Sequence, residues 1–289
     1  ISSHVFDFDD THLKTIIHPA GPVASALFPL AEHMAESGAE LLHAFILGVE
    51  TECRIGNAVY PEHYEIGWHI TGTAGVFGSA AACGRLLGLN EQQMTWALGI
   101  AGTQSSGFRE MFGTHCKSFH PGSAAKNGLA SALLAKSNFT SSNQVIEAKR
   151  GFANVMSTKH NYTAITEGLG KTFEVATNSY KPFACGIVIH PSIDGCVQLK
   201  RENKLTGAEI EKVKKSIASG VSVRTELRDG DAHAQVLACA KANNADLIVM
   251  GTQGHTGLKH ALLGSTAERV VRLAECPVLT VRGKTDAGA

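Results

Sequence analysis

Histidine and carboxylate side chains crowd the start of the chain. The segment reads HVFDFDDTH from residue 4 and continues LKTIIHPAGP, so three histidines and three carboxylates lie within residues 4–18. Carboxylates beside imidazoles shift one another's pKa toward neutrality, as acid–base chemistry requires. A frayed, solvated terminus explains this composition equally well. Residues 4–18, called the opening cluster below, are therefore either a site or an exposed end.

The whole chain has the composition of a globular protein with two domains. It has 289 residues, of which 44% are hydrophobic and 18% are charged, and its formal net charge is zero. Nothing in this balance indicates nucleic acid or a membrane surface as a partner, and no apolar run is long enough to span a bilayer. The seven cysteines show no CxxC spacing, which favours a reducing, cytoplasmic location without disulfides.

Most of the chain shows helical periodicity, so helices must position the opening cluster. Pro22 suits a first helical turn, Tyr60-Pro61 ends a helix, and Asn90 with Gln93 resembles a capping pair. The small residues of GWHITGTAGVFGSAAACG, from residue 67, predict a buried helix packed closely on its neighbours. A polar loop is expected from Thr103 to His120. The other predicted helices are 23–36, 39–58, 91–101, 122–136 and 192–203.

The character of the sequence changes near residue 219, where we place a domain boundary. Strand patterns at 221–227, 245–250 and 277–282 alternate with helical patterns at 231–243 and 265–275. This alternation predicts a partial Rossmann-like α/β segment with a parallel sheet. The predicted fold class is thus a mainly α-helical N-terminal domain followed by a partial α/β segment.

A glycine loop follows the strand at 245–250 and reads GTQGHTGLKHALLGST from residue 251. Backbone N–H groups of such a loop and of the next helix N-terminus favour phosphate. With flanks DLIVMG and AERVVRLAECPVLTVR, residues 220–284 resemble the universal stress protein family. The resemblance implies ATP or AMP as a ligand, held by the positions Gly251, Gly254, Gly264, Ser265 and Thr266. The alternative is a loop that only joins strand to helix.

The first half of that family's fold is not found in the sequence. Three strands alone leave a sheet edge unfinished, and this predicts pairing with a second copy, a homodimer.

Five ordered motifs resemble the MmgE/PrpD family over residues 1 to about 215: DFDDTH, HPAGP, the GWH segment, THCKSFHPGSAAKNGLASALLA and SYKPFACGIVIHPSID. That family includes 2-methylcitrate dehydratase, cis-aconitate decarboxylase and iminodisuccinate epimerase. The resemblance implies a large helical domain with a smaller α/β lid, acting on small polycarboxylates without metal or organic cofactor. The expected domains are a helical domain at 1–180, a truncated lid at 181–219 and a stress-protein-like segment at 220–289.

Six pocket positions follow from the resemblance. His69 or His18 is expected as the acid–base group, because imidazole titrates close to working pH. The other four divide into carboxylate anchors and orienting groups, which are Lys117 and Lys181, and Asp7 and Thr11. The alternatives are that His69 caps its helix and that both lysines are solvated surface charges. A metal site from His115, Cys116 and His120 lacks a standard ligand spacing.

The predicted function is a cofactor-independent lyase or isomerase for a di- or tricarboxylate. The same residues suit dehydration, decarboxylation and epimerisation, so the sequence does not choose among them. A truncated lid would leave the pocket open to water and weaken catalysis. The alternative is a non-catalytic stress-response protein that binds ATP or AMP, or dimerises, through its C-terminal segment.

Overall fold

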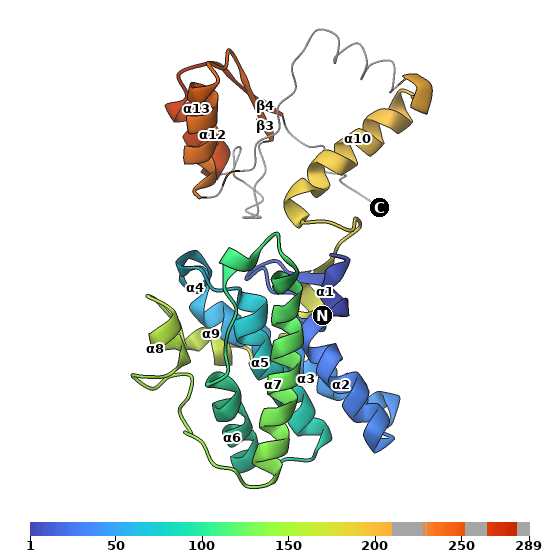
Figure 1. The fold of residues 1–289 in the computed structure, drawn as a ribbon, viewed down its shortest axis with the longest axis vertical. Helices are drawn as coiled ribbons and strands as arrows, with labels where there is room; N and C mark the ends of the chain where they lie inside the picture. The colour runs from blue at the N-terminus through green and yellow to red at the C-terminus, as the bar shows by residue number, and fades with distance from the viewer. Residues whose placement is uncertain (210–227, 229, 252–264, 282–289) are drawn as a thin grey trace. The chain divides into compact units, whose positions relative to one another are not determined.

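The computed structural model of the chain consists of two compact units, residues 1–187 and 188–289, and each unit is considered by itself (Figure 1). The residues that the structure describes are 1–209, 228, 230–251 and 265–281.

The first unit is almost entirely helical, as predicted. Its long helices are α2 (Ala20–Met34), α3 (Gly38–Val59), α5 (Ile70–Leu86), α6 (Glu91–Gly102) and α7 (His115–Lys136). Its shorter elements are α1 (Ser2–Val5), α4 (Glu62–Ile66), η1 (Arg109–Met111), α8 (Phe152–Met156), α9 (Thr163–Thr166) and η2 (Glu174–Thr177).

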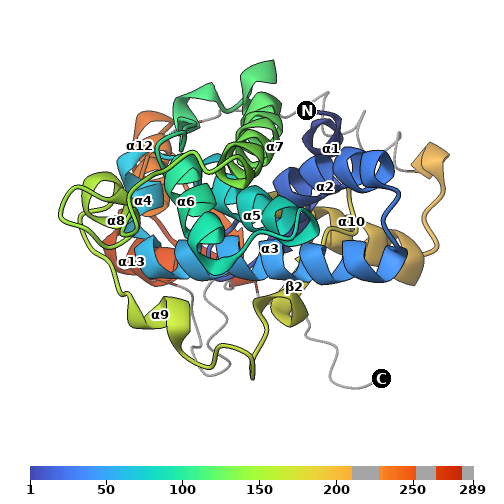
Figure 2. The same ribbon diagram turned by 90° about the horizontal axis from the view of Figure 1, so that it is seen from below.

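Helix α5 lies at the centre of this unit, against α2, α3, α6 and α7 (Figure 2). Every residue of α5 except Arg85 is buried, as expected for a helix surrounded by others. A Cβ atom added to Gly48 of α3 would lie 2.8 Å from the carbonyl oxygen of Gly78 of α5. The absence of side chains therefore permits this close crossing, and the prediction of a closely packed small-residue helix is confirmed.

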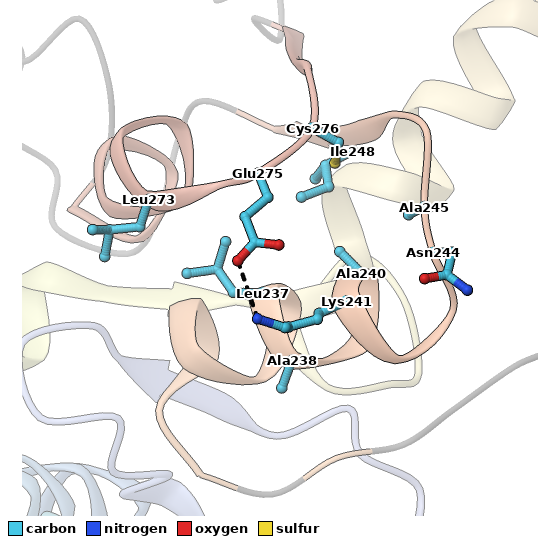
Figure 3. Close-up of a pocket in the computed structure, with 10 residues that line it drawn as sticks. All are labelled: Leu237, Ala238, Ala240, Lys241, Asn244, Ala245, Ile248, Leu273, Glu275 and Cys276. Carbon is cyan, nitrogen blue, oxygen red and sulfur yellow. Dashed lines mark hydrogen bonds and ion pairs between the residues drawn. The ribbon is translucent and has the colours of Figure 1, made fainter.

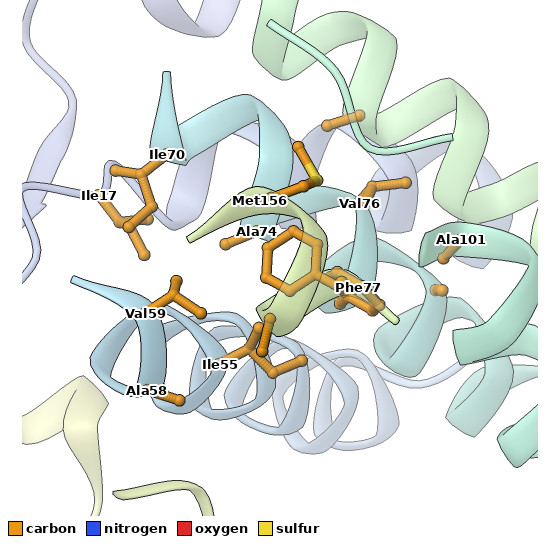
Figure 4. Packing of buried hydrophobic residues seen from close by; sticks show 14 residues of the cluster. Ile17, Ile55, Ala58, Val59, Ile70, Ala74, Val76, Phe77, Ala101 and Met156 are labelled. Carbon is orange, nitrogen blue, oxygen red and sulfur yellow. The ribbon is translucent and has the colours of Figure 1, made fainter. Parts of the chain in front are cut away.

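The apolar core is built mainly from α3 and α5. One cluster gathers Ile55 and Val59 of α3 around Ile70 and Phe77 of α5, and Met156 of α8 closes it (Figure 4). All five side chains are at most 9% exposed. This core fixes the N-terminal end of α5, where His69 lies.

Two details of the helices bear on the sequence predictions. Asn90 and Gln93 form a reciprocal capping box at the start of α6, as predicted. The polar loop expected from Thr103 to His120 is shorter, because α7 begins at His115. The Thr114 hydroxyl accepts a hydrogen bond from the amide of Cys116 at 3.2 Å and caps the helix there. Lys117 and His120 consequently lie on a helix and not in a loop.

The second unit contains α10 (His190–Glu202), α12 (Ala232–Ala242), β3 (Ile248–Gly251), α13 (Ser265–Leu273) and β4 (Val278–Val281). Strands β3 and β4 pair in parallel, with Ile248 opposite Val278. This small parallel sheet confirms the predicted α/β character. The strand expected at 221–227 lies outside the described residues.

No helix in the described part of the chain combines the length and the apolar character needed to cross a bilayer.

Candidate active site

A short strand pair brings the two ends of the first unit together. Strand β1 (Asp10–His12) pairs antiparallel with β2 (Asn178–Tyr180), and Asp10 lies opposite Tyr180. Continuing this register by one residue places Asp9 opposite Lys181. The Lys181 Nζ atom donates to Asp9 Oδ1 at 2.7 Å. The strand pair thus joins the opening cluster to the YKPF motif.

The pair formed by Asp9 and Lys181 is buried, and both side chains are 2% exposed. The other carboxylate oxygen of Asp9 accepts a hydrogen bond from Nδ1 of His4. These contacts outweigh the burial that would raise the pKa of Asp9, and the net result is a lowered pKa. Asp9 is therefore ionised and holds two positively charged or hydrogen-bonding partners.

Asp7 connects this buried pair to the surface. Its Oδ1 atom accepts from Lys181 Nζ at 3.1 Å and lies 3.4 Å from Lys117 Nζ. The Asp7 and Lys117 side chains are 29% and 26% exposed, so solvent reaches them. We call His4, Asp7, Asp9, Lys117 and Lys181 the Lys181 cluster; its two ammonium groups meet at one carboxylate oxygen.

His18 borders the Lys181 cluster. Its Nδ1 atom donates to the carbonyl oxygen of Asp10 at 2.6 Å and lies 3.2 Å from the Thr11 hydroxyl. Since a carbonyl only accepts, the proton is on Nδ1 and the other ring nitrogen, Nε2, is the basic atom. Burial is the main reason that the pKa of His18 falls to about 4. His18 is accordingly neutral at physiological pH.

His69 occupies the N-cap position of α5. Its side chain makes no capping bond; instead, its Nδ1 atom lies 2.8 Å from Nδ1 of His120 on α7. Burial, and then the nearby His120, His4, His18 and Lys117, lower the pKa of His69 well below its usual value. His69 is therefore a second neutral imidazole, and its ring centre is 5.9 Å from that of His4.

The structure places all six predicted site residues in one connected group. Lys117 and Lys181 each contact Asp7, whereas Thr11 contacts His18. The ring of His4 neighbours the rings of both His18 and His69. The alternative of solvated lysines does not hold for Lys181, which is buried.

Four residues of the group were not predicted as site residues: His4, Asp9, Asp10 and His120. Asp9 could have been found from the strand register, had the pairing of β1 with β2 been known. His120 follows Lys117 by three residues, so the two share a helix face, because α7 begins at His115.

Asp10 links strand β1 to the start of α2 and to β2, beside the group. Its carboxylate accepts from the amide of Ala20 at 3.1 Å and from Asn178 Nδ2 at 2.7 Å. Burial raises the pKa of Asp10 to about 6.

The remaining histidines of the first unit have structural or surface roles. His12 and His63 are fully buried and hydrogen-bonded at both ring nitrogens, and His33 and His43 are exposed. Within residues 1–209, 228, 230–251 and 265–281, no group of His, Cys, Asp or Glu side chains is arranged to hold a metal ion.

The second unit holds a cavity of about 500 Å³ between α12 and the segment before β4 (Figure 3). The Lys241 ammonium and the Glu275 carboxylate pair beside it at 3.1 Å. Ile248, which lines the cavity, is the first residue of β3, whereas the glycine loop leaves from the other end of that strand. Ligands of parallel α/β sheets bind at the carboxyl ends of the strands, so this cavity is not the predicted nucleotide site.

The predicted phosphate-side residues are only partly described. Gly251 is the last residue of β3, and Ser265 and Thr266 open α13. Gly254 and Gly264 lie outside the described residues.

The two parts of the chain match two protein families. One part is the helical unit with its lysines, carboxylates and neutral imidazoles, and the other is the α/β unit. The chain belongs to the MmgE/PrpD family, since the model of the MmgE/PrpD N-terminal domain matches residues 1–165. The model of the universal stress protein family matches residues 191–282. This matched range begins before residue 219, where the sequence predicts the domain boundary.

Named relatives exist for both parts. The chain is 34% identical over 209 residues to a cis-aconitate decarboxylase of Aspergillus terreus. The aligned region covers 68% of this chain and 43% of the fungal protein. It is 35% identical over 158 residues to the human cis-aconitate decarboxylase, covering 53% of this chain and 32% of that protein. Universal stress protein YxiE of Bacillus subtilis is 36% identical over 118 residues, covering 39% of this chain and 75% of YxiE. The chain thus spans less than half the length of these two decarboxylases.

Proposed function

We propose that the helical unit binds cis-aconitate or a closely related polycarboxylate and catalyses a lyase reaction, with decarboxylation the favoured one. The observation that carries this proposal is the meeting of two lysine ammonium groups at Asp7, beside two neutral imidazoles. The decarboxylase relatives support the choice of substrate class.

The lysines suit the binding of a multiply charged anion. Charge-assisted hydrogen bonds between ammonium and carboxylate are about twice as strong as neutral ones. Lys117 is solvent-accessible, and Lys181 is held in place by buried Asp9. In the free protein Asp7 orients the two ammonium groups, and a substrate carboxylate would compete with Asp7 for them.

The imidazoles suit proton transfer at a carbon atom next to a carboxylate. In a decarboxylation, the bond between the substrate carbon and the departing CO₂ breaks, the electron pair stays on the substrate, and a proton must be delivered to it. His18 and His69 are neutral without substrate, and a bound polyanion favours their protonated forms. We assign the proton transfer to His69, with His18 as the second candidate and Thr11 as its orienting partner.

The test is consumption of cis-aconitate by the full chain, with CO₂ release measured in parallel and no metal added. Activity that disappears in Lys181→Met and persists in Lys136→Met, an exposed lysine at the end of α7, supports the proposal. Equal activity in the wild type and in Lys181→Met would sink it. Parallel assays with 2-methylcitrate separate decarboxylation from dehydration.

A second function, nucleotide binding by the α/β unit, is favoured by the match to the universal stress protein family and by Gly251 and Ser265 at a strand end and a helix start. ATP should raise the melting temperature of the wild type and leave that of Gly254→Val unchanged. An equal rise in both proteins would contradict this proposal.

A further inference from the structure

His120 is the least expected member of the site, because no role was predicted for it beyond an unconvincing metal site. It lies on α7 one turn after Lys117 and is 7% exposed. Its Nδ1 atom faces Nδ1 of His69 at 2.8 Å. Two imidazole nitrogens at this distance need one proton between them, and two protons would clash. The positions of the protons on the two rings are therefore coupled.

The surroundings of His120 hold its ring in this position. A Cβ atom added to Gly107, whose φ is +126°, would lie 3.1 Å from Cγ of the His120 ring and 3.2 Å from its Nδ1. A Cβ atom added to Gly72 would lie 3.1 Å from the His120 Cβ atom. The backbone amide of His69 donates to the Gly107 carbonyl at 2.9 Å. The His120 ring and the His69 backbone are thus both held at Gly107.

We propose that His120 is a positioning residue that accepts the Nδ1 proton of His69 and so presents Nε2 of His69 as the atom that exchanges a proton with substrate. This inference rests on the proposed function, and it gives His69 the geometry of a proton-transfer group whose ring is oriented by a neighbouring residue. His120 then carries its own proton on Nε2.

The proton balance follows from this arrangement. During decarboxylation, the imidazolium form of His69 gives its Nε2 proton to the substrate carbon that keeps the electron pair of the broken C–C bond. His69 returns to the neutral form with its proton still on Nδ1, donated to His120. Solvent then restores the Nε2 proton. The imidazolium form is favoured only with a polyanion bound, because burial, and then the neighbouring imidazoles and Lys117, lower the pKa of His69 otherwise.

The experiment measures the tautomer and the turnover separately on the full chain. Two-bond ¹H–¹⁵N correlations of ¹⁵N-histidine-labelled protein report which ring nitrogen is protonated, and His69→Gln identifies the His69 signal. The wild type should carry the His69 proton on Nδ1. His120→Asn, which offers an oxygen acceptor near the same place, should preserve this tautomer, whereas His120→Phe should shift the proton to Nε2.

With cis-aconitate, His120→Phe should lower kcat by about a hundredfold with little change in KM, and His120→Asn should restore at least a tenth of the wild-type kcat. A wild-type spectrum with the His69 proton on Nε2 overturns the proposal whatever the variants do, and so does unchanged kcat in His120→Phe. If no acid is consumed but His69 is protonated on Nδ1, the pairing is supported and the proposed lyase function fails.

Discussion

Two buried ionic clusters of the helical unit differ in how completely their hydrogen bonds are satisfied. The first, the Arg54 cluster, consists of Arg54, Glu50 and the backbone that they hold. The guanidinium donates to Glu50 at 2.6 Å and to the carbonyl oxygens of Ile165, Glu167 and Thr172. Glu50 also accepts from the amide of Glu174 at 2.7 Å. Its ions are saturated by the protein itself.

The Lys181 cluster is different in two respects. Nε2 of His4 is buried and has no hydrogen-bond partner among the described residues, and the Asp7 and Lys117 side chains are open to solvent. A saturated cluster fixes a loop, whereas an unsaturated one at the surface retains capacity for a ligand. Burial and charge alone therefore do not distinguish a structural cluster from a candidate site. The two are distinguished by whether all hydrogen-bonding groups have partners and by whether solvent reaches the side chains.

The largest effect is expected from breaking the structural cluster. Arg54→Met leaves Glu50 buried without its cation and removes three bonds to the 165–172 backbone. Loss of one partner of a buried pair costs about 3–5 kcal/mol, so urea denaturation should show a drop of that size in the free energy of unfolding. The folded fraction should keep its affinity for cis-aconitate. A fall of less than 1 kcal/mol would show that this cluster is not structural.

Lys181→Met should have the next largest effect, and it should lower both stability and function. It leaves Asp9 buried without its ammonium partner, although Asp9 keeps its hydrogen bond from His4. Because Lys181 is buried between Asp7 and Asp9, we expect kcat/KM for cis-aconitate to fall at least about a hundredfold, or about 2.7 kcal/mol. The matched control is Lys136→Met. Stopped-assay kinetics at a temperature where both variants are folded would measure the difference, and equal values would contradict the assignment.

Glu52 is a third kind of buried ionisable group, because both oxygens of its carboxyl group are buried without a partner among the described residues. Burial, and then Asp10, raise the pKa of Glu52 well above its usual value. The unfolded chain therefore loses this proton at lower pH than the folded protein, and stability falls as pH rises above about 4.5, by at most about 1.4 kcal/mol per pH unit. Glu52→Gln should remove this slope in unfolding measured from pH 4 to 8. Parallel pH curves for the two proteins would refute the neutral state.

The smallest effect on stability is expected from Lys117→Ala. Its pair with Asp7 is half-exposed, so the free energy of unfolding should change by less than about 1 kcal/mol. The KM for cis-aconitate should nevertheless rise about tenfold, since one of two carboxylate anchors is lost. A change in stability without a change in KM would show that Lys117 makes a structural contact and does not bind the substrate.

Much of the helical fold could be predicted from the sequence. The six predicted site residues also come together in the structure, although their roles remain predictions. The capping pair Asn90 and Gln93 and the small-residue pattern of α5 are local signals, and local signals fix helices. The contact between Asp9 and Lys181 could not be predicted, because it depends on a strand pair formed by residues more than 160 positions apart.

The contact between His69 and His120 has the same origin. It depends on how α5 and α7 cross and on where α7 begins. The sequence predicts a helix start at residue 122, directly after Pro121, whereas α7 begins at His115 and contains Pro121. The glycine loop shows the opposite limit: its motif is clear in the sequence, but three of its four glycines lie outside the described residues.

The most direct test of the central claim is the binding of cis-aconitate to the full chain by isothermal titration calorimetry, at a pH near 7. We predict binding to the wild type and to Lys136→Met, and at least a tenfold weaker affinity in both Lys117→Ala and Lys181→Met. Wild-type affinity in Lys181→Met, or no binding to any of the four proteins, would contradict the account.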